Sequence, residues 1–164
     1  MYLVRDTLLE TRGRAPLKIV CIGNRWRCDD AAGLEVAARL RGTLPPTVTL
    51  VEHEGEPTAL IDAWAGADAL WLVDAVASGA AAGTVHRLDA SERELPADLF
   101  RASTHHVGVA EAVELARALD RLPQRTILFG IEGGSFEIGD ELTAPVARAV
   151  DRVAAAIRKE VARA

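Results

Sequence analysis

An apolar run that stops at a Gly-Asn pair and is followed by two adjacent acids constrains the fold of this chain most. Residues 17–22 are mostly apolar and rich in β-branched side chains, as in a strand buried on both faces of a parallel sheet. Gly23 ends this strand, and Asp30 is well placed as the N-cap of a helix. The loop between them therefore lies at the carboxyl end of a strand, where open α/β sheets usually place their sites. The buried face of the helix is predicted to carry Leu34, Ala37 and Ala38, widened by Val36 and Leu40.

The two acids have a structural and a functional interpretation. Asp29 and Asp30 could be a cap and a first-turn acid, both favoured by the helix dipole. One of them could instead be a metal ligand or an acid/base group. The loop does not fit a nucleotide site, because Gly23 is not followed by the remaining glycines of G-x-G-x-x-G and the P-loop lysine is missing.

The rest of the chain alternates between strand and helix patterns. Four more strands are predicted at 48–51, 69–73, 84–88 and 126–130, and the weak alternation of 84–88 indicates an edge strand. The order β-α-β-α-β-β-α-β-α predicts a three-layer α/β/α fold, with a twisted, mostly parallel five-stranded sheet and helices on both faces.

Three more helices follow from caps and apolar spacing. Thr58 is predicted to cap a short helix, and Thr143 to cap the last helix, with Pro145 in its first turn. A helix between them follows the two histidines at 105–106. The short helix carries Leu60, Ile61 and Trp64, and the next helix carries Val109, Val113, Ala116 and Leu119 at helical spacing. The buried face of the last helix is expected to carry Val146, Val150, Val153 and Ile157.

Length and composition limit the classes of function. The 164 residues suit one domain over 17–164 after an irregular N-terminal extension at 1–16. A net charge of −5 gives no attraction to phosphate backbones, so we expect no nucleic acid partner. Cys21 and Cys28 have no zinc-ribbon or disulfide spacing, which favours a reducing cytoplasm. No signal peptide or membrane-spanning run is recognisable, so we expect no membrane association.

Another acid and a pair of histidines could join the first loop. Asp74 follows the third predicted strand, where it could face the same crevice or cap a turn over Ala75 and Val76. His105 and His106 precede a helix, where an imidazole can donate, accept or ligate. Two carboxylates and an imidazole suit a borderline divalent ion such as nickel or zinc. An incomplete coordination sphere leaves room for substrate groups or water.

At these residues the sequence resembles the hydrogenase maturation proteases, cytoplasmic endopeptidases that remove a C-terminal extension from the large subunit of nickel-iron hydrogenases. The resemblance runs from about Lys18 to the last helix and rests on the number, order and spacing of short motifs. These are Ile22-Gly23-Asn24, Asp29-Asp30, Gly33, Val73-Asp74-Ala75, Gly83-Thr84-Val85, Ser103-Thr104-His105, Gly108, Gly130-Ile131-Glu132 and Leu142-Thr143-Ala144-Pro145.

The resemblance implies metal-binding positions at Asp30, Asp74 and His105, with Asp30 and Asp74 as the catalytic residues. It implies that nickel arrives already inserted in the large-subunit precursor and licenses cleavage, and zinc or cadmium could substitute in vitro. The family is grouped with aspartic-type peptidases, and a monomer can act on such a large partner. Nickel could polarise the scissile carbonyl or activate a water, or one carboxylate could serve as general base. His106, beside His105, leaves open which imidazole points inward.

Two other functions stay compatible with the sequence. One is a non-catalytic, metal-checking chaperone of the same fold that binds the precursor without cutting it. The other is a different hydrolase on the same scaffold, because a fold does not define a reaction. The loop Glu54-Gly55-Glu56-Pro57 replaces the Gly-Thr-rich turn of better-known relatives, which indicates a different subgroup.

Overall fold

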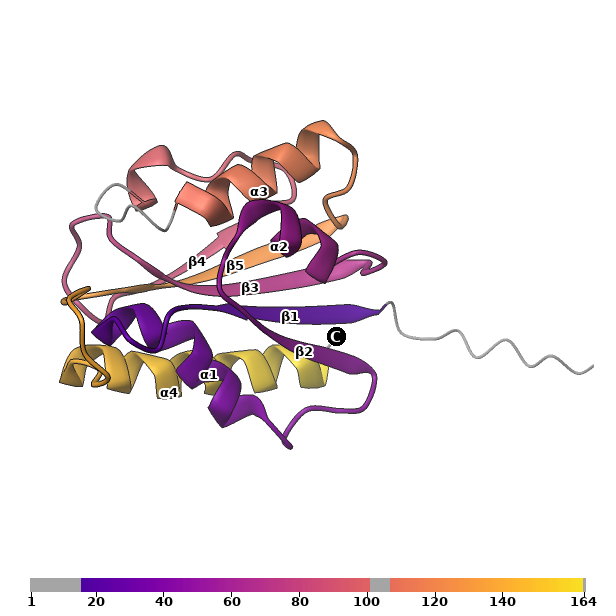
Figure 1. The fold of residues 1–164 in the computed structure, drawn as a ribbon. Coiled ribbons are helices and arrows are strands. Elements are labelled where there is room, and N and C mark those ends of the chain that lie inside the picture. The colour runs from indigo at the N-terminus through magenta and orange to yellow at the C-terminus, as the bar shows by residue number, and fades with distance from the viewer. Residues whose placement is uncertain (1–15, 101–106, 164) are drawn as a thin grey trace, which may run out of the picture.

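A five-stranded sheet in the order β2-β1-β3-β5-β4 forms the middle layer of the molecule (Figure 1). The computed structural model describes residues 16–100 and 107–163. The strands are β1 (Leu17–Ile22), β2 (Val48–His53), β3 (Ala69–Val76), β4 (Val85–Asp89) and β5 (Arg125–Glu132). All neighbouring strands are parallel except β4, which pairs antiparallel with β5 at the edge. The predicted mostly parallel sheet and the edge position of its fourth strand are therefore confirmed.

Helices cover both faces of the sheet, as predicted (Figure 1). The helices α1 (Ala32–Leu40) and α4 (Ala144–Arg163) pack together on one face, and α2 (Pro57–Ala63) and α3 (Val107–Ala118) pack together on the other. Two short 3-10 helices, η1 (Cys28–Ala31) and η2 (Ala97–Phe100), complete the elements. Within the described part of the chain, no helix has the length and apolar character needed to cross a membrane.

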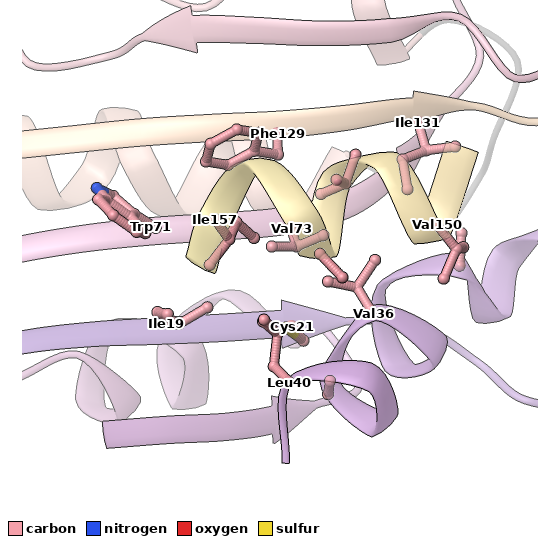
Figure 2. Packing of buried hydrophobic residues seen from close by; sticks show 14 of the residues in the cluster. Ile19, Cys21, Val36, Leu40, Trp71, Val73, Phe129, Ile131, Val150 and Ile157 are labelled. Carbon is pink, nitrogen blue, oxygen red and sulfur yellow. The ribbon is translucent and has the colours of Figure 1, made fainter. Parts of the chain in front are cut away.

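Strand alternation divides the core into two apolar clusters. Ile19, Trp71 and Phe129 face α1 and α4, and Figure 2 shows them packed against Val36, Leu40, Val150 and Ile157. Val20, Leu72 and Leu128 point the other way, toward α2 and α3. Each large side chain buried in this way contributes about 1.5–3 kcal/mol. Burial on both faces explains why these strands read as continuous apolar runs.

Three strands run further than the sequence predicts. Backbone pairing continues through Ile22 and His53 in β1 and β2, and through Val76 and Glu132 in β3 and β5. The predicted ends at 51 and 73 directly precede the polar residues Glu52 and Asp74, and the predicted end at 130 is a glycine. A parallel ladder joins main-chain groups, so it continues past these residues.

The buried face of α1 differs from the prediction. Gly33, Val36, Ala37 and Leu40 are buried, whereas Leu34 is half-buried and Ala38 is exposed. The reason is the close approach at Gly33, where a Cβ atom would lie 2.1 Å from the Ile22 carbonyl oxygen and 2.7 Å from that of Val73. The helix therefore faces the sheet through Gly33 rather than through Leu34.

Two other predictions about helix ends need correction. The side chain that caps α2 is Glu56, not Thr58, because its carboxylate accepts from the Thr58 and Ala59 backbone N–H groups at 3.1 and 2.7 Å. Leu119, predicted to continue the helical pattern, lies beyond the end of α3 and is 55% exposed. The start of α4 agrees with the prediction, since the Thr143 carbonyl accepts from Ala147 N and Pro145 lies in the first turn.

Candidate active site

The carboxyl ends of β1, β2 and β3 meet at one edge of the sheet. β2 and β3 flank β1, and the helices that follow β1 and β2 cover opposite faces. A change of face of this kind leaves a crevice outside the strand ends, which is where ligands bind in open α/β sheets. The residues that follow or end these three strands are therefore the first candidates for a site.

Asp30 lies at this edge but does not cap a helix. It is part of η1, and the residue at the N-cap position of α1 is Ala31, which makes no side-chain capping bond. The predicted N-cap role of Asp30 is therefore wrong, because a 3-10 turn separates the loop from α1. Only 3% of Asp30 is exposed, and this residue lines a groove.

The groove has a volume of about 720 Å³ and extends from the loop after β1 to the loop after β2. It is lined by Gly23, Asn24, Arg25, Trp26, Asp30, Leu34, Glu52, His53, Glu54, Glu56 and Ala59. The Nδ1 atom of His53 accepts from Gly55 N at 2.8 Å, so the ring proton of the neutral imidazole is on Nε2. The Ala59 and Thr58 backbone N–H groups lower the pKa of Glu56. This groove is large enough for an extended stretch of polypeptide.

Asp74 lies inside β3 rather than after it. It is opposite Gly130 of β5 and is fully buried. The alternative prediction of a turn cap over Ala75 and Val76 is wrong, because both residues continue the strand. Strand alternation places Asp74 on the same face as Leu72 and Val76, which pack with α2 and α3.

The first turn of α1 lies directly on the strand that carries Asp74. Gly33 approaches the carbonyl oxygen of Val73, the residue before Asp74, and η1 contacts β3. Asp30 and Asp74 are separated by 44 positions in sequence. Their elements, η1 and β3, contact each other at the edge of the sheet where the parallel strands end.

The two histidines of the predicted site, His105 and His106, lie outside the described residues. The helix that follows them, α3, begins beside the groove. A Cβ atom at Gly108 would lie 2.4 Å from the carbonyl oxygen of Gly55, which is flanked by the groove residues Glu54 and Glu56. Within 16–100 and 107–163, no three His, Cys, Asp or Glu side chains could hold a metal ion.

Comparisons with known proteins agree with this geometry. A family model described as hydrogenase maturation protease matches residues 34–160. This chain belongs to that family. Asp74 lies inside the matched region, and Asp30 lies four positions before it. No match was found among curated proteins.

Solved structures of the same family have the same fold. The hydrogenase maturating endopeptidase HybD from E. coli is 26% identical, with a TM-score of 0.73 over 88% of this chain and 93% of that one. The [NiFe] hydrogenase maturation protease HycI from Thermococcus kodakarensis KOD1 is 25% identical, with a TM-score of 0.71 over 93% and 96% of the two chains. The [NiFe] hydrogenase maturation protease HybD from Thermococcus kodakarensis, at 22% identity and a TM-score of 0.68, shares the fold over 88% and 98%.

One of the two adjacent acids, Asp29, has a structural role. The fully buried Asp29 carboxylate accepts from Gly134 N, Ser135 N, Thr143 N and Thr143 Oγ1 at 2.7 to 2.9 Å. It therefore joins η1 to the loop after β5 and to the start of α4. Both acids lie in the first turn of η1, and neither occupies the N-cap position of η1 or α1.

Sequence reasoning missed two side chains at this edge. Glu132 enters the sequence analysis only as the last residue of a short motif, but it ends β5, and its buried carboxylate accepts from Ser78 N, Ser78 Oγ and Gly79 N at 2.8 to 3.0 Å. It also lies 3.1 Å from His86 Nε2. His53 was not singled out, although it lines the groove with Asp30. The available signal for both was their position at the carboxyl end of a strand.

Proposed function

We propose that this maturation protease is an endopeptidase that removes the C-terminal extension of a nickel-loaded [NiFe]-hydrogenase large-subunit precursor. The observation that carries the proposal is the position of Asp30, in a groove of about 720 Å³ at the sheet edge that also carries Asp74. The family match supplies the reaction class, hydrolysis of a peptide bond.

Nickel belongs to the substrate in this proposal. The precursor brings the metal, and Asp30, Asp74 and His105 complete its coordination when the tail lies in the groove. Carboxylate oxygen and imidazole nitrogen are suitable donors for nickel, and zinc or cadmium would be bound by the same set in vitro. The start of α3 against Gly55 supports the inclusion of His105, because this residue precedes α3 by two positions.

Both acids bind the nickel in this proposal, and the different surroundings of Asp30 give it a second role. Asp74 is fully buried in the strand on which the first turn of α1 packs, and in this proposal its carboxylate is a ligand of the substrate's nickel. Asp30 lines the groove, so it can reach the scissile peptide and the attacking water. It takes one proton from the water as general base. The water oxygen bonds to the carbonyl carbon, the C–N bond breaks, and the proton passes to the leaving amine.

We also propose a binding partner, an oligomeric state and a cellular compartment for the protease. The partner is the large-subunit precursor, the protease acts as a monomer, and the reaction takes place in the cytoplasm. Cys21 and Cys28 are free thiols, which agrees with a reducing compartment. Proteolysis would act as a check that metal insertion is complete.

Intact-mass analysis of the precursor tests this function. The precursor of the same organism is incubated with the protease after loading with nickel, and in parallel without metal. We expect loss of one C-terminal peptide from the loaded precursor only. Equal cleavage of both forms would exclude nickel gating. Binding of the loaded precursor without any mass change would instead support the chaperone alternative.

A further inference from the structure

Two exposed apolar side chains lie on adjoining loops beside the groove. Trp26 is 67% exposed and Ile138 is 93% exposed. The loops meet at these residues, because the Trp26 carbonyl accepts from Gly139 N at 2.9 Å. A single exposed apolar residue is ordinary. Here two of them lie on loops whose backbones are hydrogen-bonded beside them, and one, Trp26, also lines the groove that contains Asp30.

Several hydrogen bonds join the loop of Trp26 to the loop of Ile138. Cys28 N donates to Gly139 O at 2.8 Å, and Asp29 N donates to Ser135 O at 3.0 Å. The Arg27 guanidinium donates twice to the Phe136 carbonyl, at 2.9 and 3.1 Å. A surface held in this way loses little conformational freedom on binding, which favours affinity.

Carboxylates surround the apolar pair. Glu137, Asp140 and Glu141 are exposed on the loop of Ile138, and Glu54 and Glu56 are exposed on the groove side of Trp26. Two arginines flank Trp26: Arg25 lies 3.7 Å from Glu52, and Arg27 donates to the Phe136 carbonyl, so these five exposed carboxylates outnumber the cations of the Trp26 loop. Charge complementarity therefore favours a partner segment with lysine or arginine beside its apolar side chains and disfavours an acidic segment.

We propose that Trp26, Ile138 and the acids Glu137, Asp140 and Glu141 form a docking surface for the substrate precursor. It binds a polypeptide segment that carries apolar side chains flanked by lysine or arginine. The inference rests on the proposed function, because the bound polypeptide is the one whose scissile bond lies at Asp30. Tryptophan is enriched among the residues that dominate interface affinity, so Trp26 is the main anchor. The surface thus determines which protein the protease recognises.

Steady-state cleavage of the nickel-loaded precursor tests the apolar pair. Trp26→Ala is expected to raise KM at least about tenfold, which corresponds to loss of an interface anchor. Ile138→Ser is expected to raise KM by a smaller factor. For both variants we expect KM to change and kcat to stay the same. Leu119→Ser is the matched control, because Leu119 is an exposed apolar residue beyond α3, and it keeps the KM of the unmodified protein. Thermal melts confirm that each variant is folded.

The acids are tested by charge reversal. Glu137→Lys combined with Glu141→Lys is expected to raise KM for the precursor, and its KM depends less on salt than that of the unmodified protein. Glu111→Lys, at an exposed position of α3, is the control for net charge. An equal response of the two charge-reversed proteins would contradict the charged part of the proposal.

The outcomes separate this inference from the proposed function. If the unmodified protein cleaves the precursor and the folded Trp26→Ala and Ile138→Ser proteins have the same KM, the docking surface is wrong and the function stands. If the unmodified protein does not cleave the loaded precursor, the proposed function is wrong. The docking surface is then tested by measuring how tightly the variants bind the loaded precursor. Weaker binding by Trp26→Ala than by Leu119→Ser supports it, and equal binding overturns it.

Discussion

The carboxylate of Asp29 holds Thr143 through both of its oxygen atoms. Thr143 N donates to Oδ1 at 2.7 Å, and Thr143 Oγ1 donates to Oδ2 at 2.9 Å. These bonds connect η1 to the residue that starts α4, across the end of the sheet. Because Asp30 follows Asp29 directly, the same bonds fix the turn that presents Asp30 to the groove.

Asp29→Ala is expected to destabilise the fold by about 3 kcal/mol, because the substitution leaves the donors of Gly134, Ser135 and Thr143 without their charged acceptor. Denaturant unfolding measures the loss. Asp62→Ala removes a surface ion pair with Arg121 and serves as the control, with a loss of less than about 1 kcal/mol. An unchanged unfolding midpoint for Asp29→Ala would contradict the structural role of this acid.

Gly33→Ala is expected to push α1 away from the strand ends. The new methyl group would lie 2.1 Å from Ile22 O and 2.7 Å from Val73 O, and both are backbone atoms. Overpacking of this kind costs about 1–3 kcal/mol. Cleavage by the folded fraction also falls, because the turn with Asp30 moves relative to Asp74. Ala38→Ser, on the exposed face of the same helix, should retain stability and activity. Full activity of Gly33→Ala would show that this close approach does not position the site.

Glu132→Gln is expected to loosen the loop that follows β3. Gln keeps the size of the side chain but removes the charge that accepts from Ser78 and Gly79. Charged hydrogen bonds are the stronger class. Hydrogen exchange at the Ser78 and Gly79 amides should become faster, whereas exchange in the buried strand β1 should change less. Unchanged protection at both amides would mean that Glu132 does not hold this loop.

Glu56 gives a pH-dependent contribution to stability. Backbone N–H groups of Ala59 and Thr58 hold its pKa below the ordinary value of 4.5. A carboxyl group with a lowered folded-state pKa stabilises the fold above its unfolded-state pKa, and this stabilisation is lost as the pH falls through the folded-state value. Glu56→Ala should therefore lower Tm at pH 7, and the difference from the unmodified protein should shrink as the pH falls below 4.5. A difference that stays constant with pH would contradict a charged cap.

The places of the strands along the chain and their mostly parallel pairing could be predicted, because burial leaves a strong apolar pattern. β1 matches its prediction at both ends, since every second side chain faces one of two apolar clusters. The ends of β3 and β5 could not be predicted, because Asp74 interrupts the apolar run of β3 and Gly130 that of β5, while the backbone pairing continues through both residues. Asp74 and Glu132 are polar residues within these strands, and they lie at the edge of the sheet that carries the candidate site.

The roles of the adjacent acids could not be separated from the sequence. Asp29 and Asp30 are neighbours of the same type, and local patterns treat them alike. The partners of Asp29 lie 105 to 114 positions further along the chain, so only the folded structure reveals its bonds. His53 was missed for a similar reason, because its groove is formed by loops after two different strands. The assignment of His105 stays a prediction.

The most direct test of the account is the cleavage of nickel-loaded precursor by Asp74→Asn, followed by intact mass. Asn has the size of Asp but lacks the charge that we assign to binding the substrate's nickel. The account predicts that the folded Asp74→Asn protein leaves the precursor at full mass, whereas Asp62→Asn, a substitution at an exposed acid, releases the C-terminal peptide as the unmodified protein does. Release of the peptide by Asp74→Asn at the unmodified rate would contradict the proposed site.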